Sequence, residues 1–326
     1  MVMLNINNST ELSARVVRVA SHMRVAILAA AVTLGAIATG TQSASASPIT
    51  LGSASSYGVF VGSGNTLALG GGFNLSGNLG LGSSDTLSKS GSNAVSGTEY
   101  RDSSLTTSGS GTLTVSGGTI TQSMSAIRTA AESASTTAAA LTATTGLTDQ
   151  GGSITSSVTI KALTNLSENV LDISALSLAN STLTFDDNGF TGAKFIVNVT
   201  GAFSVTGSSI IKGINGASGS DVIFNIEGTG STVSLTGNSS SSLIGTILAP
   251  TRNINLSGGG TLTGAVLAGL NGTGYTVQTQ TGGYNITSLG YVPRSVSTPE
   301  PSSIALFGAG VGVLIAIRRR MRPARP

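Results

Sequence analysis

The chain has 326 residues, of which 45 are glycine, none is cysteine and only 9% are charged, and this balance argues against a mainly helical protein. Without cysteine there is no disulfide framework and no thiolate metal site, and the single histidine, His22, lies in a segment that we expect to be removed. The composition predicts an all-β protein of short strands and Gly/Ser/Asn turns, with no cofactor.

The positive net charge of +3 comes from the two ends of the chain. Between residues 47 and 298, eight Lys and Arg side chains stand against eleven Asp and Glu, which gives 8 − 11 = −3. The body is therefore slightly acidic, and it has no basic stripe interleaved with aromatic residues. We expect no nucleic-acid partner.

Residues 1–46 are predicted to be a signal peptide that signal peptidase removes. The apolar stretch VAILAAAVTLGAIAT follows Arg24 and runs into small residues. Ala44 and Ala46 form an A-x-A cleavage pattern, so Ser47 is the expected first mature residue. A buried helix is the alternative. The chain start stays open, because both Met1 and Met23 precede a usable signal peptide.

Threonine pairs of the T-x-T type recur along the body, where they could form a lattice of hydroxyl groups. Neighbouring hydroxyls would lie about 6.7 Å apart along a strand and about 4.8 Å apart between strands. Such a lattice could order water as in ice, but it is also what any Ser/Thr-rich solvated sheet presents. The candidate surface residues are Thr112, Thr114, Thr119, Thr121, Thr261 and Thr263.

A helix is predicted at about residues 123–142, in SMSAIRTAAESASTTAAAL. Apolar residues recur there at intervals of three and four, which places Met124, Ile127, Ala131, Ala134, Ala138 and Leu141 on one face. Arg128 and Glu132 are spaced as an i,i+4 ion pair, and Ser123 or Ser125 could cap the helix start. We expect a surface helix packed beside a sheet, with a coil segment as the alternative.

Five segments, which start at Val170, Phe195, Val222, Leu243 and Leu262, each contain two alternating apolar runs separated by a turn. The spacing near 20 residues predicts stacked coils of a parallel β-helix, with a β-sandwich as the alternative. Superposing the segments puts Gly245 over Gly264 and Asn198 over Asn225, and stacked Asn side chains could bond along the coil axis.

Asp186 and Asp187, in FDDNGF, are the only adjacent acid pair in the body. Two carboxylates could hold Ca²⁺ or divide the acid and base roles of a glycosidase. The competing interpretation is a tight turn, because Asn-Gly is a strong turn signal. We favour the turn, and since the other acids are dispersed we expect no enzyme activity.

The chain ends in STPEPSSIALFGAGVGVLIAIRRRMRPARP, and this tail resembles the PEP-CTERM sorting signal. Its parts are Pro299-Glu300-Pro301, an apolar run over residues 302–317, and the arginines Arg318, Arg319 and Arg320. The resemblance implies processing by exosortase, with a linker over 293–301 and a transmembrane sorting segment with a basic tail over 302–326. Whether the tail is cleaved or kept as an anchor stays open.

The body resembles the choice-of-anchor A family of adhesive domains on LGSASSYGVFVGSGNTLA, GNLGLG, FIVNV, VIFNI, GTILAP and LTGAVLAG, and its layout is shared with the DUF3494 ice-binding family. The resemblance implies a right-handed, discontinuous parallel β-helix over residues 47–292 with one flanking helix. It also implies an exported surface or matrix protein that contacts exopolysaccharide or another surface. Ice binding through a flat Thr-rich face is the alternative.

Overall fold

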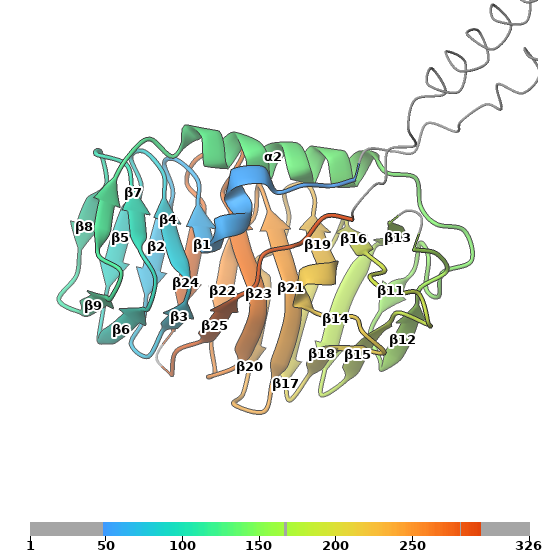
Figure 1. Ribbon diagram of the computed structural model, residues 1–326. Helices are drawn as coiled ribbons and strands as arrows, with labels where there is room; N and C mark the ends of the chain where they lie inside the picture. The colour runs from blue at the N-terminus through green and yellow to red at the C-terminus, as the bar shows by residue number, and fades with distance from the viewer. Residues whose placement is uncertain (1–47, 166–167, 281, 295–326) are drawn as a thin grey trace, which may run out of the picture. The chain divides into compact units, whose positions relative to one another are not determined.

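The computed structural model describes residues 48–165, 168–280 and 282–294, all within the unit that begins at Ser47. Strands of this unit coil around one axis and pair in parallel with strands of the neighbouring coils, which makes the body a parallel β-helix with one long helix (Figure 1). The predicted fold is confirmed. The signal peptide, the Pro-Glu-Pro motif and the sorting segment lie outside the described residues.

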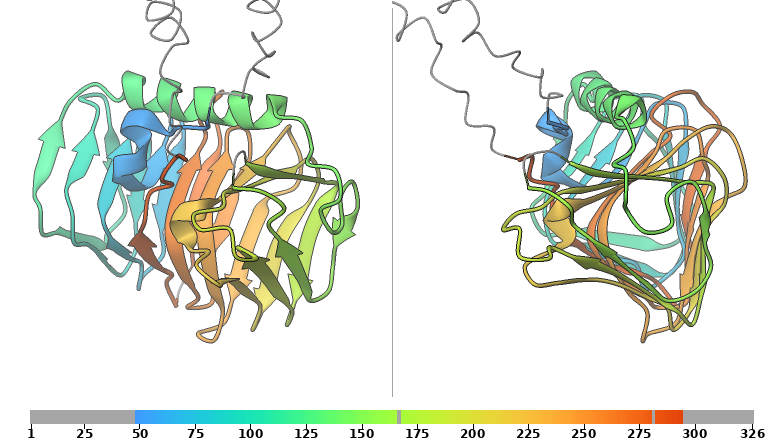
Figure 2. Two further views of the ribbon diagram at one scale, coloured as in Figure 1. Left: turned by 45° about the vertical axis from the view of Figure 1, so that its right-hand side comes forward. Right: turned by 90° about the vertical axis from the view of Figure 1, so that its right-hand side faces the viewer.

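Three sides, each made of stacked strands, surround the axis (Figure 2, right). The helix side contains β10 (Thr119–Thr121), β7 (Glu99–Arg101), β4 (Asn78–Leu81), β1 (Tyr57–Val61), the second halves of β23 (Thr261–Ala268) and β21 (Ser242–Ala249), β19 (Val222–Ile226), β16 (Phe195–Val199) and β13 (Asn169–Ile173). The nine-stranded sheet contains β11 (Ser153–Ile154), β14 (Ala175–Ala179), β17 (Phe203–Gly207), β20 (Val233–Gly237), β22 (Ile254–Leu256), β24 (Thr276–Thr279), β2 (Thr66–Leu69), β5 (Thr86–Lys89) and β8 (Thr106–Ser108).

The third side contains β12 (Val158–Lys161), β15 (Thr182–Asp186), β18 (Ile210–Ile214), the first halves of β21 and β23, β25 (Asn285–Ser288), β3 (Asn74–Ser76), β6 (Ser92–Val95) and β9 (Thr112–Val115). Two short 3₁₀ helices, η1 (Gly52–Ser56) and η2 (Gly219–Asp221), precede β1 and β19. Each coil has up to three strands, one on each side. The sequence predicts only two, because each segment was read as two alternating runs.

The stacking order of the coils is discontinuous in sequence. β1, β2 and β3 of the first coil pair with β23, β24 and β25 of the last, so the first and last coils meet in the middle of the stack. In Figure 1 the blue and teal N-terminal coils therefore lie beside the orange C-terminal coils. The helix α2 (Ser125–Ala140) runs back along the stack to the end at which β11 begins the second series of coils.

The interior is filled by the inward residues of the alternating strands. β20, for example, buries Val233 and Leu235 completely and leaves Ser234 half-buried on its outer side. Ring contacts join the coils, with the Phe203 and Phe224 centroids 5.4 Å apart in an edge-on arrangement. Each fully buried side chain of this size contributes about 1.5–3 kcal/mol relative to exposure. The core therefore forms only when neighbouring coils stack.

β21 and β23 turn the corner between the third side and the helix side at two stacked glycines. The predicted superposition of Gly245 on Gly264 is confirmed by the strand register. Gly245 has a φ of +114°, and a Cβ at Gly264 would lie 1.9 Å from the Gly245 carbonyl oxygen. Because no larger residue fits this approach, glycine is required at the corner.

The helix α2 packs its predicted apolar face on the helix side. Met124, Ile127, Ala131, Ala134 and Ala138 are buried, and Leu141 packs partly against the same cluster. Arg128 and Glu132 form the predicted ion pair at 3.7 Å. The predicted cap by Ser123 or Ser125 is wrong, because the N-cap residue is Met124 and no side chain caps the helix; the Ser125 N–H only donates a long bond to Ser123 Oγ at 3.4 Å. The small alanines of the buried face allow the helix to pack closely on the strands.

Candidate functional surface

The outer face of the nine-stranded sheet is a regular surface that no described helix covers (Figure 2). Four strands of adjacent coils place a threonine at the same register position on this face. In order along the axis they are Thr106, Thr86, Thr66 and Thr276. They form a column of hydroxyl groups with a spacing of about 4.8 Å, the distance between neighbouring strands.

A second column runs parallel to the threonines, two residues further along each strand. It contains small or neutral polar side chains, in axial order Ser108, Ser88, Ala68, Gln278, Asn255, Ser234, Ser204 and Ser177. Apart from Lys89 at the end of β5, the strands of this sheet contain no charged residue. The face therefore presents hydroxyl and amide groups in a two-dimensional repeat, with Lys89 as the charged side chain of its strands.

Asn65 and Asp85 hold the threonine column in register from the turns that precede it. The Asn65 N–H donates to Asp85 Oδ1 at 2.9 Å, and Asn65 Oδ1 accepts from the Tyr275 N–H at 2.8 Å. Asn65 Nδ2 donates to the Gly269 carbonyl at 2.9 Å. Burial raises the pKa of Asp85 to about 7, against the lowering effect of the N–H groups of Asn65, Gly82 and Gly64. The hydrogen bonds of Asn65 and Asp85 therefore connect the turns of neighbouring coils.

The six threonines predicted as surface candidates do not share one face. Thr112 and Thr114 lie in β9, and Thr261 and Thr263 lie in the first half of β23, both on the third side. β6, β3 and β25 separate these two pairs. Thr119 and Thr121 lie in β10 at the edge of the helix side. A role for these residues stays a prediction, and a continuous lattice formed by all six is not present.

Sequence reasoning missed the column on the nine-stranded sheet, although a signal for it exists. SGNTLALG at residues 63–70 and SSDTLSKS at residues 83–90 repeat with a spacing of 20 residues. Each contains an Asn or Asp, a threonine and a leucine in the same order. Two residues after Thr66 and Thr86 stand Ala68 and Ser88 instead of a second threonine. A search for T-x-T pairs therefore misses this repeat.

The acid pair of FDDNGF lies in a tight turn at the end of β15. Asn188 and Gly189 have φ values of +52° and +84°, and the Phe190 N–H donates to the Asp187 carbonyl at 2.7 Å, as in a type I′ turn. Asp186 Oδ1 accepts from Asn215 Nδ2 at 2.7 Å and from the Asn188 N–H at 2.8 Å. These bonds, that of Asn215 first, lower the pKa of Asp186.

Both carboxyl groups are buried, but neither oxygen of Asp187 is in hydrogen-bonding geometry, and burial followed by the charge of Asp221 raises the pKa of Asp187 to about 6. The two carboxyl groups therefore have opposite environments and do not act as one pair. Among residues 48–165, 168–280 and 282–294, no group of three or more acidic or histidine side chains is placed to hold a metal ion.

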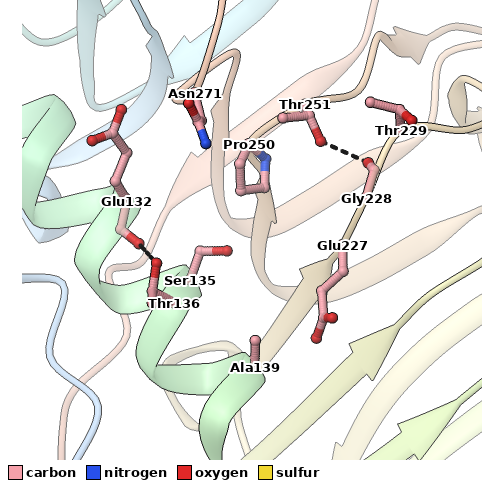
Figure 3. Close-up of a pocket in the computed structure, with 10 residues that line it drawn as sticks. All are labelled: Glu132, Ser135, Thr136, Ala139, Glu227, Gly228, Thr229, Pro250, Thr251 and Asn271. Carbon is pink, nitrogen blue, oxygen red and sulfur yellow. Dashed lines mark hydrogen bonds between the residues drawn. The ribbon is translucent and has the colours of Figure 1, made fainter.

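An open pocket of about 520 Å³ lies between α2 and the turns that follow β19 and β21 (Figure 3). Glu132 and Glu227 reach it from opposite walls, and it contains no Lys or Arg among its lining residues. Its remaining walls are Ser135, Thr136, Ala139, Gly228, Thr229, Pro250, Thr251 and Asn271. Burial, with Asp172 second, raises the pKa of Glu227. The pocket can accept hydrogen bonds from hydroxyl or ammonium groups.

These features define a β-helical protein that presents an extended, uncharged polar sheet, with its opposite side closed by a helix. Residues 26–285 match the family described as "Putative Ice-binding-like adhesive domain", and the chain belongs to this family. Residues 297–320, which include Pro299-Glu300-Pro301 and Arg318–Arg320, match the PEP-CTERM protein-sorting motif. None of the curated proteins matches the chain.

Three of the solved structures that resemble this chain are ice-binding proteins. One from an Antarctic biological consortium has a TM-score of 0.52 and 23% identity, covering 77% of this chain and 96% of its own. One from the Antarctic ascomycete Antarctomyces psychrotrophicus has a TM-score of 0.47 and 18% identity, covering 75% and 99%. The DUF3494 domain of Shewanella frigidimarina ice-binding protein 1 has a TM-score of 0.46 and 17% identity, covering 74% and 97%. At these identities the likeness concerns the fold.

Proposed function

We propose that the protein is an exported, non-enzymatic adhesive protein that binds exopolysaccharide through the outer face of the nine-stranded sheet. The observation that supports this most is the column of Thr106, Thr86, Thr66 and Thr276 beside a second neutral column. A repeated array of small hydroxyl side chains suits a ligand that itself repeats. Many weak contacts to one chain then add up, because each bound sugar raises the local concentration of the next.

Neutral polysaccharides expose hydroxyl groups that both donate and accept hydrogen bonds. The Thr, Ser, Asn and Gln side chains of the face have the same double capacity. Since the strands carry no charge except Lys89, binding is expected to depend little on salt. The family's description as adhesive supports a surface-binding role.

The sorting motif supports the location that we propose. Signal peptidase would release the N-terminus at Ser47, and exosortase would act near Pro299-Glu300-Pro301 after transient anchoring in the inner membrane. The body would then reach the cell surface or matrix. Within the described part of the chain, no helix is long and apolar enough to cross a membrane, and the predicted sorting segment is outside that part. The mass of protein extracted from the cell surface tests both cleavages.

A binding experiment with matched variants tests the proposed face. Thr86→Tyr and Thr276→Tyr together place two large rings in the column, whereas Thr287→Tyr places one on the third side. We expect the double variant to lose retention on matrix polysaccharide and on a glycan array, and the Thr287 variant to keep it. Equal retention by all three proteins, or none by the unaltered protein, would contradict the proposal.

Ice binding is the second candidate, and the threonine column favours it specifically. Its hydroxyls and methyls recur at the strand spacing, so the column could order water molecules in a regular row. Thermal hysteresis and recrystallisation measurements on the same variants decide between the two. Ice shaping that the tyrosines abolish, without glycan binding, would replace the adhesive proposal. Unaltered ice growth would leave only the adhesive one.

A further inference from the structure

Lys194 and Asp221 form a buried pair on two neighbouring coils. Phe195 of β16 is in register with Val222 of β19, so the residues directly before these strands lie one above the other. Lys194 and Asp221 are each only 6% exposed, and Lys194 Nζ contacts Asp221 Oδ1. An ammonium and a carboxylate that leave water together lose hydration which their attraction only partly replaces. A reaction that removes both charges would therefore lower the free energy of the folded protein at this position.

The second oxygen of the Asp221 carboxyl group is held by two donors. Oδ2 accepts from the Ser218 N–H at 2.8 Å and from Ser218 Oγ at 2.5 Å, within the capping box of η2. Donors fixed on one carbonyl oxygen stabilise the negative charge that develops there when a nucleophile adds to the carbon. Lys194 Nζ contacts the other oxygen, Oδ1, so the amine is held next to the same carboxyl group.

Asp187 adds an acid to this arrangement. Its side chain is 1% exposed, and neither carboxylate oxygen is in hydrogen-bonding geometry, although the Gly192 N–H is near enough to lower the pKa. The charges of both Asp221 and Lys194 act on Asp187, and burial is the main cause that raises its pKa to about 6. Asp187 therefore adds a buried carboxyl group whose charge would act against that of Asp221.

Aromatic cover keeps water away from the pair. The Tyr291 ring centroid is 5.7 Å from Lys194 Nζ, and Tyr291 is 2% exposed. Glu168, the residue before β13, occupies the equivalent position one coil below Lys194 and is also buried. The amine is therefore enclosed between carboxyl groups and an aromatic ring, away from competing nucleophiles.

We propose that Lys194 and Asp221 condense into an amide bond that covalently joins the coil of β16 to the coil of β19. A proton first passes from the ammonium to Asp221 Oδ1. The neutral nitrogen then adds to Cγ, and the negative charge on Oδ2 is held by Ser218.

The nitrogen next gives one proton to Oδ1, which leaves as water as the C–O bond breaks. One ammonium and one carboxylate thus become one amide and one water, with no oxidation or reduction.

Fixed geometry makes this condensation feasible. Reacting groups held in contact have effective concentrations of about 10⁵–10⁸ M, which offsets the unfavourable loss of water that limits amide formation in solution. The product is neutral, so it also removes the cost of burying two ions. The bond would prevent these two coils from separating when a surface-bound protein is pulled.

Peptide mapping of the full-length chain, unfolded and digested with trypsin, tests the bond. Trypsin does not cleave after an acylated lysine, so we expect residues 162–212 as one peptide joined to residues 213–252, one water lighter than their sum. Separate peptides 162–194, 195–212 and 213–252 from the unaltered protein would overturn the proposal. This measurement depends on no variant.

Variants then assign the roles. Lys194→Arg keeps the positive charge but offers no amine, so the cross-link should vanish. Lys212→Arg, at an exposed lysine, is the control and should leave the cross-link unchanged. A cross-linked mass in Lys194→Arg would overturn the assignment to Lys194.

Discussion

Asn225 lies directly above Asn198 beneath α2, and its Nδ2 donates to Asn198 Oδ1 at 3.0 Å. Asn198 Nδ2 continues the ladder to Asp172 Oδ1 at 2.9 Å on the next coil. The ladder also joins the helix to the sheet, because Ser135 Oγ donates to Asn225 Oδ1 at 2.6 Å and Asn198 Nδ2 donates to the Ala138 carbonyl at 3.0 Å. One stacked pair of amides therefore sets both coil register and helix position.

Replacing Asn225 by Leu should lower the free energy of unfolding by about 1–3 kcal/mol, because Asn198 and Ser135 would be left buried without this partner. Asn74→Leu is the matched control, since Asn74 Nδ2 also donates to an asparagine, Asn285, but on the exposed third side. Urea denaturation of both variants provides the comparison. An equal loss of unfolding free energy in the two variants would show that burial of the ladder adds nothing to its contribution to stability.

Arg252 should be intolerant of lysine. Its guanidinium is buried and donates to the carbonyl oxygens of Gly228, Ser231, Thr200 and Glu227, which belong to turns of two coils. Lysine lacks the planar fork that reaches several oxygens at once, so Arg252→Lys should cost about 3 kcal/mol.

Arg128→Lys, on the surface of α2, is the control for Arg252 and should change stability by less than about 0.5 kcal/mol. Thermal unfolding followed by circular dichroism measures both variants. A shift of the midpoint that is the same for the two would contradict the clamp assigned to Arg252.

Asp85 should make the protein less stable as the pH rises. Burial raises its pKa to about 7 in the folded state, whereas the unfolded chain has the ordinary value of 3.8. Between these values the folded state binds the extra proton, so the stabilisation is complete below about pH 4 and is lost as the pH passes 7. Asp85→Asn should flatten this slope in urea titrations at several pH values. Asp149→Asn, at an exposed turn, should keep the slope of the unaltered protein.

The alanine stripe of α2 should not accept larger side chains. Ala131 is completely buried against the helix side, so Ala131→Leu is expected to cost about 1–3 kcal/mol through overpacking. Ala126→Leu places the same side chain on the exposed face of the same helix and should be close to neutral. Unfolding midpoints of the two variants check the difference. A stabilised Ala131 variant would mean that the helix packs loosely.

The fold could be predicted to a large extent because it repeats. Gly245 over Gly264 and Asn198 over Asn225 are read from the sequence, since coils of similar length place equivalent residues at equivalent positions. The helix could be placed from the spacing of its buried residues. The third strand of each coil was harder to find, because it follows the second after a very short turn, such as the two residues between β14 and β15.

The candidate surface was predicted less well. T-x-T pairs identify threonines within one strand, whereas the column of Thr66, Thr86, Thr106 and Thr276 runs across strands. Thr276 joins that column only because the last coil stacks on the first. Nothing local in the sequence indicates a pairing between residues more than 200 positions apart.

The sequence by itself determined the class of fold, the helix and the sorting motif, because each depends on local periodicity or on a short contiguous pattern. Only the tertiary structure decided which polar residues share the uncovered face and which charged residues meet inside. Lys194 and Asp221 are unremarkable in the sequence, and coil stacking alone brings them into contact. Stacking is driven by burial of apolar side chains in the core, which fixes the neighbours of every polar group on the outside.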